Sequence, residues 1–272
     1  MDHEEPARGR VVVVKPVWGS GSIGVLRCDD PASAEAHARL LLLQKMNERG
    51  VPVPQEVLVE ELVHGPEFSV ETIGRTVVGV TQKHLGAEPL FVEIGHDFPA
   101  PLQAKQATAL ARTTLAALDA LGLGWGPAHT ELRVGPDGPV VIEVNPRLAG
   151  GFIPELVRHA KGIDLVTEVV RAAAGHTPRL RPRHARAASI RFLLAPNAGI
   201  VAGRRGLPAA QAIRGVKDAR FYVAIGDRAR LGGDFRDRVG HVIAVAPTAA
   251  DSARRATQAL GALSLVVRPE GP

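Results

Sequence analysis

Two carboxylates and an amide oxygen are the side chains in this sequence best placed to do chemistry. Glu131, Glu143 and Asn145 lie in the stretch ELRVGPDGPVVIEVNPR, where two apolar, β-branched runs flank Gly-Pro-Asp-Gly. That turn chemistry predicts a β-hairpin. With the turn centred near Asp137, Glu131 lies directly across from Glu143, and strand alternation puts Asn145 on the same face as Glu143.

This convergence of oxygens suits a magnesium ion. Mg²⁺ takes hard oxygen ligands and is often held by one or two carboxylates together with substrate phosphates. Arg147 lies just beyond and could bind a phosphate bidentately. The alternative is a solvated hairpin face, since Asp and Glu usually lie on the surface. The apolar residues around Glu143 favour the metal site, but the rest of the chain has to decide.

Composition bounds the class of protein. The chain has 272 residues, of which 45% are apolar and 22% charged, as expected for one large or two small globular domains. The single cysteine, Cys28, rules out an internal disulfide and a multi-cysteine metal site. The N-terminal residues lack the apolar core of a signal peptide, and no apolar run approaches membrane-spanning length. We therefore expect a soluble, cytoplasmic protein without membrane partners.

Positive charge is concentrated in one segment. From Arg179 to Arg238 there are 14 Lys or Arg residues against 4 Asp or Glu. No nucleic-acid recognition motif accompanies this segment, and aromatic residues are scarce. A solvated basic face, or a surface that meets another subunit or an anionic ligand, fits better than nucleic-acid binding.

A lysine inside an apolar strand precedes a glycine-rich loop. Lys15 interrupts the run 11–17 and needs a partner, for which an anion would serve. Ser20, Gly21 and Ser22 follow within Gly-Ser-Gly-Ser-Ile-Gly, and such turns can form a phosphate-binding nest of backbone N–H groups. No Gly-Lys-Ser/Thr of a Walker loop is present, and a second strand follows. The pattern predicts a flap over phosphates, with a flexible hairpin as the alternative.

Two apolar strand pieces separated by Glu60-Glu61 and Gly-Pro indicate a connector between two lobes. Backbone groups on such a connector could bind an adenine edge, and a carboxylate a few residues further on could accept hydrogen bonds from both ribose hydroxyls.

The remaining patterns predict the elements that position these residues. Helices are expected near 31–49, 102–121, 154–161, 164–174 and 249–260. Strands are expected near 68–73, 76–83, 188–194, 220–225, 241–245 and 263–267. Leu40, Leu41, Leu43 and Met46 form a stripe on the first helix that we expect to be core.

The order of these motifs resembles the ATP-grasp superfamily of carboxylate–amine ligases. The shared features are the strand lysine, the glycine-rich flap, the Glu-Glu connector, Gly-Pro-Glu, and Glu131 followed by Glu-Val-Asn-Pro-Arg. The segments FVEIGH (91–96), GPAHTE (126–131) and IEVNPR (142–147) look most like the L-amino acid ligase branch, which makes dipeptides and related amides. The resemblance runs from about Val11 to the C-terminus.

The resemblance implies an α+β fold in which two lobes sandwich ATP. Residues 1–63 would form the small lobe, 64–178 the large lobe with the Mg-ATP site, and 179–272 a C-terminal α+β subdomain. The implied cofactors are ATP and Mg²⁺, with Mn²⁺ as an alternative ion. A substrate carboxylate would attack the γ-phosphate to give an acyl phosphate, which an amine would displace, leaving ADP and phosphate.

The resemblance also implies a role for each matching residue. Lys15 would bind the α/β-phosphates, and the β/γ-phosphates would be bound by Ser20, Gly21 and Ser22. Adenine would be bound by Glu60, Glu61 and Val63, and ribose by Glu67. Mg²⁺ binding falls to Glu131, Glu143 and Asn145, and charge stabilisation on the transferring phosphoryl group falls to Arg147.

Glu93 and His96 match positions that contact the amino-acid substrate in that branch. Glu93 would hold an α-ammonium group, and His96 would lie by the carboxylate or tune proton transfer. For each, the alternative is a structural residue with its hydrogen bonds satisfied. We expect His129 to support Glu131.

The chain departs from the family pattern at its start. The family carries roughly a domain's length of sequence before the lysine strand, whereas only ten residues precede Val11 here. The sequence therefore predicts either a fragment or truncated gene product, or a chain to which a second polypeptide supplies the missing domain. A homo-oligomer is the alternative assembly. The small-molecule partners would be a carboxylate and an amine. The alternatives are an ATP-binding subunit or remnant without activity alone, and a carboxylase or purine-type ATP-grasp chemistry.

Overall fold

The computed structural model of the protein describes residues 11–269, which form two compact units. Unit 1 comprises residues up to 63 together with 85–93 and 231–237. Unit 2 comprises 64–84, 94–230 and the residues from 238 onward. The first segment of unit 1 ends at Val63. The two later segments of unit 1 come from parts of the chain that we had assigned to other domains.

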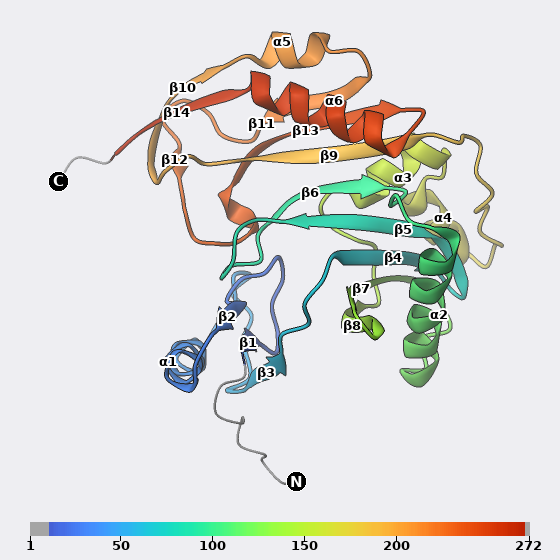
Figure 1. The fold of residues 1–272 in the computed structure, drawn as a ribbon, viewed down its shortest axis with the longest axis horizontal. Helices are drawn as coiled ribbons and strands as arrows, with labels where there is room; N and C mark the ends of the chain where they lie inside the picture. The colour runs from blue at the N-terminus through green and yellow to red at the C-terminus, as the bar shows by residue number, and fades with distance from the viewer. Residues whose placement is uncertain (1–10, 270–272) are drawn as a thin grey trace, which may run out of the picture. The chain divides into compact units, whose positions relative to one another are not determined.

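The elements follow one another along the chain as Figure 1 shows by colour. The strands within residues 11–269 are β1 (Val12–Pro16), β2 (Leu26–Cys28), β3 (Val57–Glu61), β4 (Glu67–Ile73), β5 (Thr76–Leu85), β6 (Glu93–Phe98), β7 (Pro127–Gly135), β8 (Gly138–Asn145), β9 (Ala187–Leu194), β10 (Gly199–Arg205), β11 (Val216–Phe221), β12 (Arg228–Ala229), β13 (Arg238–Ala246) and β14 (Ser264–Arg268). The helices are α1 (Pro31–Leu42), α2 (Ala104–Ala120), α3 (Ile153–Lys161), α4 (Leu165–Ala173), α5 (Leu207–Ala212), α6 (Ala249–Ala262) and the short 3₁₀ helix η1 (Phe235–Asp237). None of these helices combines the length and the apolar character that a membrane crossing needs.

Unit 1 contains a three-stranded sheet in the order β2-β1-β3. Helix α1 packs on it through a cluster of Val12, Val14, Cys28 and Leu41. The helix begins as predicted, because the Asp30 carboxylate accepts a hydrogen bond from the Ser33 backbone N–H and Pro31 occupies the first turn.

Helix α1 ends at Leu42, seven residues before the predicted end at Arg49. The Asn47 side chain accepts hydrogen bonds from the backbone N–H groups of Arg49 and Val51, so the chain forms a turn where we expected helix. Of the predicted core stripe only Leu41 is buried. The prediction was wrong for three residues, which are 55–77% exposed: Leu40, Leu43 and Met46.

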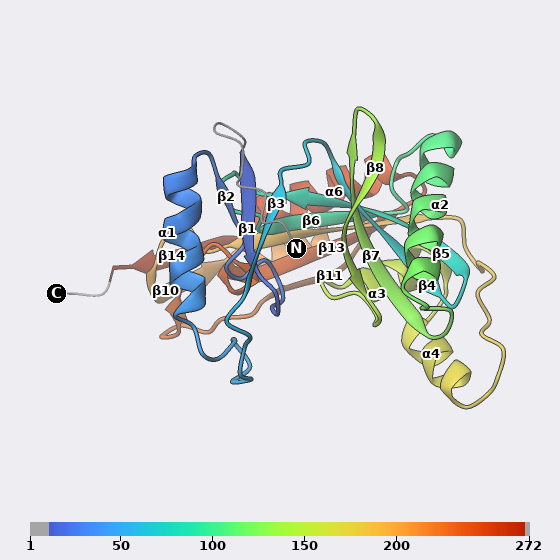
Figure 2. The same ribbon diagram turned by 90° about the horizontal axis from the view of Figure 1, so that it is seen from below.

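Unit 2 is built on an eight-stranded sheet in the order β11-β13-β9-β6-β5-β4-β7-β8. Helix α2 covers one face, burying Phe68, Val70, Leu110 and Leu132, and Figure 2 shows it beside the β7–β8 hairpin. Helix α3 covers part of the opposite face through an apolar cluster that includes Ile153, Leu156, Ile73, Ile190 and Phe192. Helix α6 packs on β9 and β13.

The strands of the C-terminal part of the chain are divided between two sheets. Strands β9, β11 and β13 belong to the eight-stranded sheet, whereas β10, β12 and β14 form a separate three-stranded sheet. Strand β10 was missed by sequence analysis, because its sequence GIVAGRR combines two glycines with two arginines and has little strand character.

The β7–β8 hairpin contains a bulge that determines its chemistry. Gly135 pairs with Gly138 across a two-residue turn, and a regular ladder from there would place Ile142 opposite Glu131. The register shifts between Glu131 and Leu132, so that Glu143 lies opposite Glu131. The predicted pairing is confirmed, and it depends on this one extra residue.

Three charged or titratable side chains, His84, Asp97 and Arg191, meet between β5, β6 and β9. The Asp97 carboxylate is 2.6 Å from His84 Nε2 and accepts hydrogen bonds from Arg191 Nη1 (2.8 Å) and Nη2 (3.1 Å). Burial opposes ionisation of this carboxyl, but the hydrogen bonds from His84 and Arg191 outweigh it and hold the pKa of Asp97 well below its usual range.

We predict that Asp97→Asn destabilises the protein in a pH-dependent way. The folded-state pKa lies below the unfolded value of about 3.9, so the stabilisation is fully present above that pH and is lost as the pH falls below it. Urea unfolding at neutral pH should show a loss of about 2–5 kcal/mol. The difference between the two proteins should shrink as the pH falls from about 4 towards 2. Asp137→Asn, an exposed change in the β7–β8 turn, should have little effect at either pH. A difference that stays constant with pH would contradict the assignment.

Candidate functional site

Charged side chains alternate along β4 and β7 in unit 2. Glu67 pairs in register with Arg133, Ser69 with Glu131, and Glu71 with His129. The alternation that buries Phe68, Val70 and Leu132 under α2 puts all of these polar side chains on the opposite face of the sheet.

Lys83 on β5 joins two of the carboxylates. Its Nζ lies 2.7 Å from Glu67 Oε1 and 2.8 Å from Glu131 Oε2, and its side chain is almost fully buried. Arg133 Nε donates to the other oxygen of Glu67 at 3.0 Å. Both oxygens of Glu67 are therefore paired with cations.

His129 joins the other two carboxylates. Its Nε2 lies 2.9 Å from Glu131 Oε1 and its Nδ1 lies 2.9 Å from Glu71 Oε1, which also accepts from Ser69 Oγ. Burial favours the neutral ring, but Glu71 and Glu131 outweigh it and raise the pKa of His129 to about 10. His129 therefore supports Glu131 in the way we expected.

The whole network balances its charge. It contains three carboxylates (Glu67, Glu71 and Glu131) and three cations (Lys83, His129 and Arg133). Buried charge is tolerated only when it is paired and hydrogen-bonded. The network therefore holds Glu131 in one orientation, with each of its oxygens fixed by a different cation.

Glu131, Glu143 and Asn145 lie together on this face. Glu143 is exposed, Asn145 is half-buried opposite His129, and the Glu131 side chain is 17% exposed. Within residues 11–269 no three Asp, Glu, His or Cys side chains converge into a complete metal cage. Two carboxylates and an amide still fit Mg²⁺, which keeps water and phosphate oxygens in its shell. A carboxylate has about four acceptor sites, so an oxygen that accepts a hydrogen bond can also bind a metal ion.

Arg147 follows directly after β8. Its backbone N–H donates to Asn145 in a tight turn, and its exposed guanidinium donates to the Leu148 carbonyl at 3.0 Å. The side chain is accessible to a ligand.

The predicted nucleotide-binding residues other than Glu67 lie in unit 1, where Lys15 has an internal partner. Its Nζ is 2.5 Å from Glu60 Oε2, across the β1–β3 pair. Glu61 is exposed and Val63 half-buried. The anion that we expected beside Lys15 is thus a carboxylate of the chain itself.

The glycine-rich loop is held by contacts within unit 1. Gly21 (φ 62°) and Ser22 (φ 63°) both adopt the left-handed conformation, and a Cβ on Gly21 would lie 2.3 Å from the Phe235 ring. Ser20 Oγ donates to Glu48 Oε1 at 2.6 Å, and Ser22 Oγ donates to the Phe91 carbonyl at 2.9 Å.

The two predicted substrate residues lie on β6. Glu93 begins the strand and is half-buried. His96 is fully buried, pairs across from Ile190, and meets the Phe192 ring edge-to-face with centroids 5.6 Å apart. Their roles, and the ribose contact of Glu67, stay predictions.

Sequence analysis missed Lys83, Glu71 and Arg133. A signal was present, because β4 carries Glu67, Ser69 and Glu71 at alternate positions between apolar residues. Such a strand requires cations on its neighbours, but the sequence does not say which strands those are.

The chain is similar to known proteins in both sequence and fold. Residues 9–155 match the model of the ATP-grasp domain, and residues 191–268 match the L-amino acid ligase C-terminal domain 2. The chain is 42% identical over 240 residues to the uncharacterised protein y4rH of Sinorhizobium fredii, and 30% identical over 182 residues to carnosine synthase 1 of Gallus gallus. The L-amino acid ligase of Bacillus licheniformis has the same fold, with a TM-score of 0.81 at 24% identity.

The protein belongs to the ATP-grasp family, and its C-terminal part is of the L-amino acid ligase type. The matches cover 88%, 64% and 98% of this chain. They cover only 50%, 20% and 66% of the S. fredii, chicken and B. licheniformis proteins, so the chain spans a part of each.

We predict that Lys83→Met destabilises unit 2 by about 3–5 kcal/mol, because it leaves Glu67 and Glu131 without their shared cation. Urea unfolding would measure the loss. Lys105→Met, an exposed change on α2, is the matched control and should cost less than about 0.5 kcal/mol. Adding Glu67→Gln to Lys83→Met should recover part of the loss, since it removes one of the two carboxylate charges that Lys83 neutralised. Simple additivity of the two changes would contradict the proposed coupling.

Proposed function

We propose that the protein is the catalytic part of an ATP-dependent ligase that joins the carboxylate of an amino acid to an amine. The observation that carries the proposal is the fixed Glu131–Glu143 pair with Asn145 on the same face, a donor set for Mg²⁺. The match of the C-terminal part to an L-amino acid ligase domain supports this chemistry over that of a carboxylase. Carnosine synthase among the relatives agrees with it.

The reaction has two displacements. A carboxylate oxygen of the first substrate attacks the γ-phosphorus, the bond to the β-phosphate oxygen breaks, and ADP leaves. The nitrogen of the second substrate then attacks the acyl carbon, the bond to phosphate breaks, and the nitrogen loses a proton. No nucleophilic side chain is needed, so catalysis depends on positioning and on charge stabilisation.

The site residues of unit 2 would bind the metal ion, orient its ligands and stabilise charge. Mg²⁺ held by Glu131, Glu143 and Asn145 would neutralise phosphate charge when bound. Lys83 and His129 keep Glu131 oriented towards Glu143, and each of them is also paired with a second carboxylate. Arg147 is accessible and would stabilise charge on the transferring phosphoryl group.

In unit 1, Lys15 would exchange Glu60 for a phosphate oxygen. Ser20, Gly21 and Ser22 would present backbone N–H groups to the phosphates, since their hydroxyls and the loop are held by Glu48 and Phe91. Adenine would lie along Glu60 to Val63. Glu93 and His96 would bind the amino acid.

The test is calorimetric titration of the chain with MgATP, followed by a screen of amino-acid pairs for phosphate release. We predict that Glu143→Ala weakens Mg²⁺-dependent ATP binding by about tenfold or more, or about 1.4 kcal/mol, and abolishes phosphate release. Asp137→Ala, in the turn of the same hairpin, should leave both unchanged.

Full turnover by Glu143→Ala would overturn the site assignment. MgATP binding without phosphate release from any pair would favour an ATP-binding part that needs a second polypeptide for turnover. Bicarbonate-dependent turnover would favour a carboxylase.

A further inference from the structure

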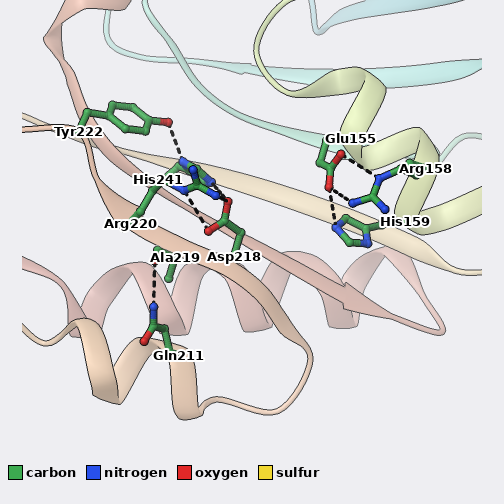
Figure 3. A network of polar contacts seen from close by, with 9 residues as sticks. All are labelled: Glu155, Arg158, His159, Gln211, Asp218, Ala219, Arg220, Tyr222 and His241. Carbon is green, nitrogen blue, oxygen red and sulfur yellow. Dashed lines mark hydrogen bonds and ion pairs between the residues drawn. The ribbon is translucent and has the colours of Figure 1, made fainter. Parts of the chain in front are cut away.

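A chain of three hydrogen-bonded side chains, outside the residues assigned above, joins β11 and the residue that follows it to β13 (Figure 3). Tyr222 Oη is 2.7 Å from His241 Nδ1, and His241 Nε2 is 3.0 Å from Asp218 Oδ2. Arg220 pairs in register with His241, so the alternating residues Asp218, Arg220 and Tyr222 lie on the face of the sheet that carries His241.

The direction of these hydrogen bonds follows from the donors available. A carboxylate only accepts, so His241 Nε2 carries a proton and donates it to Asp218. His241 Nδ1 is then the acceptor for the Tyr222 hydroxyl. Burial lowers the pKa of His241, which keeps the ring neutral, with a lone pair on Nδ1. A proton moved from Tyr222 to Nδ1 would give an imidazolium ion already paired with Asp218.

Two ring contacts link this chain of residues to the end of the Arg147 loop and to His96. Phe152, whose ring lies 4.5 Å from that of His241, follows immediately after the loop that begins with Arg147. Phe192 lies opposite His241 in the sheet and meets His96 edge-to-face.

Phe152 has a left-handed backbone (φ 61°), which is strained for a residue with a side chain. Strain of this kind persists where the surroundings enforce it, and it is concentrated near functional sites. The end of the Arg147 loop is thus anchored on the ring of His241.

The hydrogen-bonded chain of side chains is accessible to solvent at its Tyr222 end. His241 is fully buried, whereas Tyr222 is 42% exposed. A ligand can therefore reach the phenol but not the imidazole. A comparable imidazole is that of His159 on α3, whose Nε2 lies 3.2 Å from Glu155 Oε1 (Figure 3).

We propose that Tyr222, backed by His241 and Asp218, accepts the proton that the amine nitrogen loses when it attacks the acyl phosphate. The inference rests on the proposed ligase function. As the C–N bond forms, an N–H bond breaks and its proton goes to Tyr222 Oη, whose own proton passes to His241 Nδ1. The bond between the acyl carbon and phosphate breaks, and phosphate leaves with the electron pair.

Three cationic groups of the Glu131 network are poor acceptors for that proton. Lys83 and Arg133 are protonated, and His129 is an imidazolium ion held between two carboxylates. Tyr222–His241 offers a neutral acceptor whose protonated form is already paired.

The experiment compares two acceptors of the acyl group. Hydroxylamine is uncharged near neutral pH and needs little help to lose its proton, and its product is a hydroxamate. The twenty common L-amino acids serve as carboxylate donors with MgATP, and the same amino acids serve as amine acceptors. Tyr222→Phe and His241→Phe remove the acceptor atoms, and the second keeps the ring contact with Phe152. His159→Phe makes the same change on α3 as a control.

We expect both test variants to form hydroxamate within about twofold of the parent, and to form the amide about 10²-fold more slowly. The control should resemble the parent with both acceptors. Equal losses with both acceptors would overturn the relay in favour of a structural role, and an unchanged amide rate would overturn it outright. Absence of hydroxamate from the parent would instead overturn the proposed ligase function.

A second measurement does not depend on activity. Tyr222 is the only tyrosine in the sequence, so ultraviolet absorbance of the phenolate follows this residue alone. Burial raises the pKa of Tyr222. Its hydrogen bond to a neutral imidazole favours the protonated phenol further, so His241→Phe should lower this pKa while leaving it above its usual range. His159→Phe should not change it. An unchanged Tyr222 titration in His241→Phe would show that the hydrogen-bonded chain is absent in solution.

Discussion

The pairing of buried charges across β5, β4 and β7 is the constraint on which the rest of unit 2 depends. Three carboxylates and three cations occupy one face, and each is tolerated there only because its partner lies on a neighbouring strand. A slip of one residue would turn all of them towards α2 and bring the apolar residues to the other face. The charges therefore specify the register as strongly as the apolar core does.

This arrangement separates the two tasks of the sheet. The face under α2 contributes apolar burial, while the opposite face holds Glu131 in a fixed position beside Glu143. A buried ion network of this kind adds little net stability compared with an apolar core. Its value here is geometric, because a carboxylate bound by two cations cannot rotate away from the position that the proposed metal site requires.

Sequence patterns predicted most helices and strands, because amphipathic spacing and caps such as Asp30-Pro31 act locally. They also predicted that Glu131 faces Glu143, although nothing in the sequence indicates the bulge at Ile142 that makes this pairing. The end of α1 and the partners of Lys15 and Glu131 could not be predicted in the same way. They depend on Asn47, Glu60 and Lys83, whose contacts are set by turns and by strand order rather than by spacing. The resemblance to a family gave roles to residues but not their internal partners.

Unit 1 is assembled from three separate parts of the chain, and this has a consequence for how the molecule could be divided. The chain enters or leaves that unit five times within the described residues. The aromatic ring that covers Gly21 belongs to Phe235, more than two hundred positions later in the sequence. A fragment that ends at Val63 would contain the glycine-rich loop but not the Phe235 ring that packs against it. Unit 1 is thus not a cassette that can be cut out or exchanged as one contiguous piece of gene, and nascent chains complete it only after most of unit 2 has been synthesised.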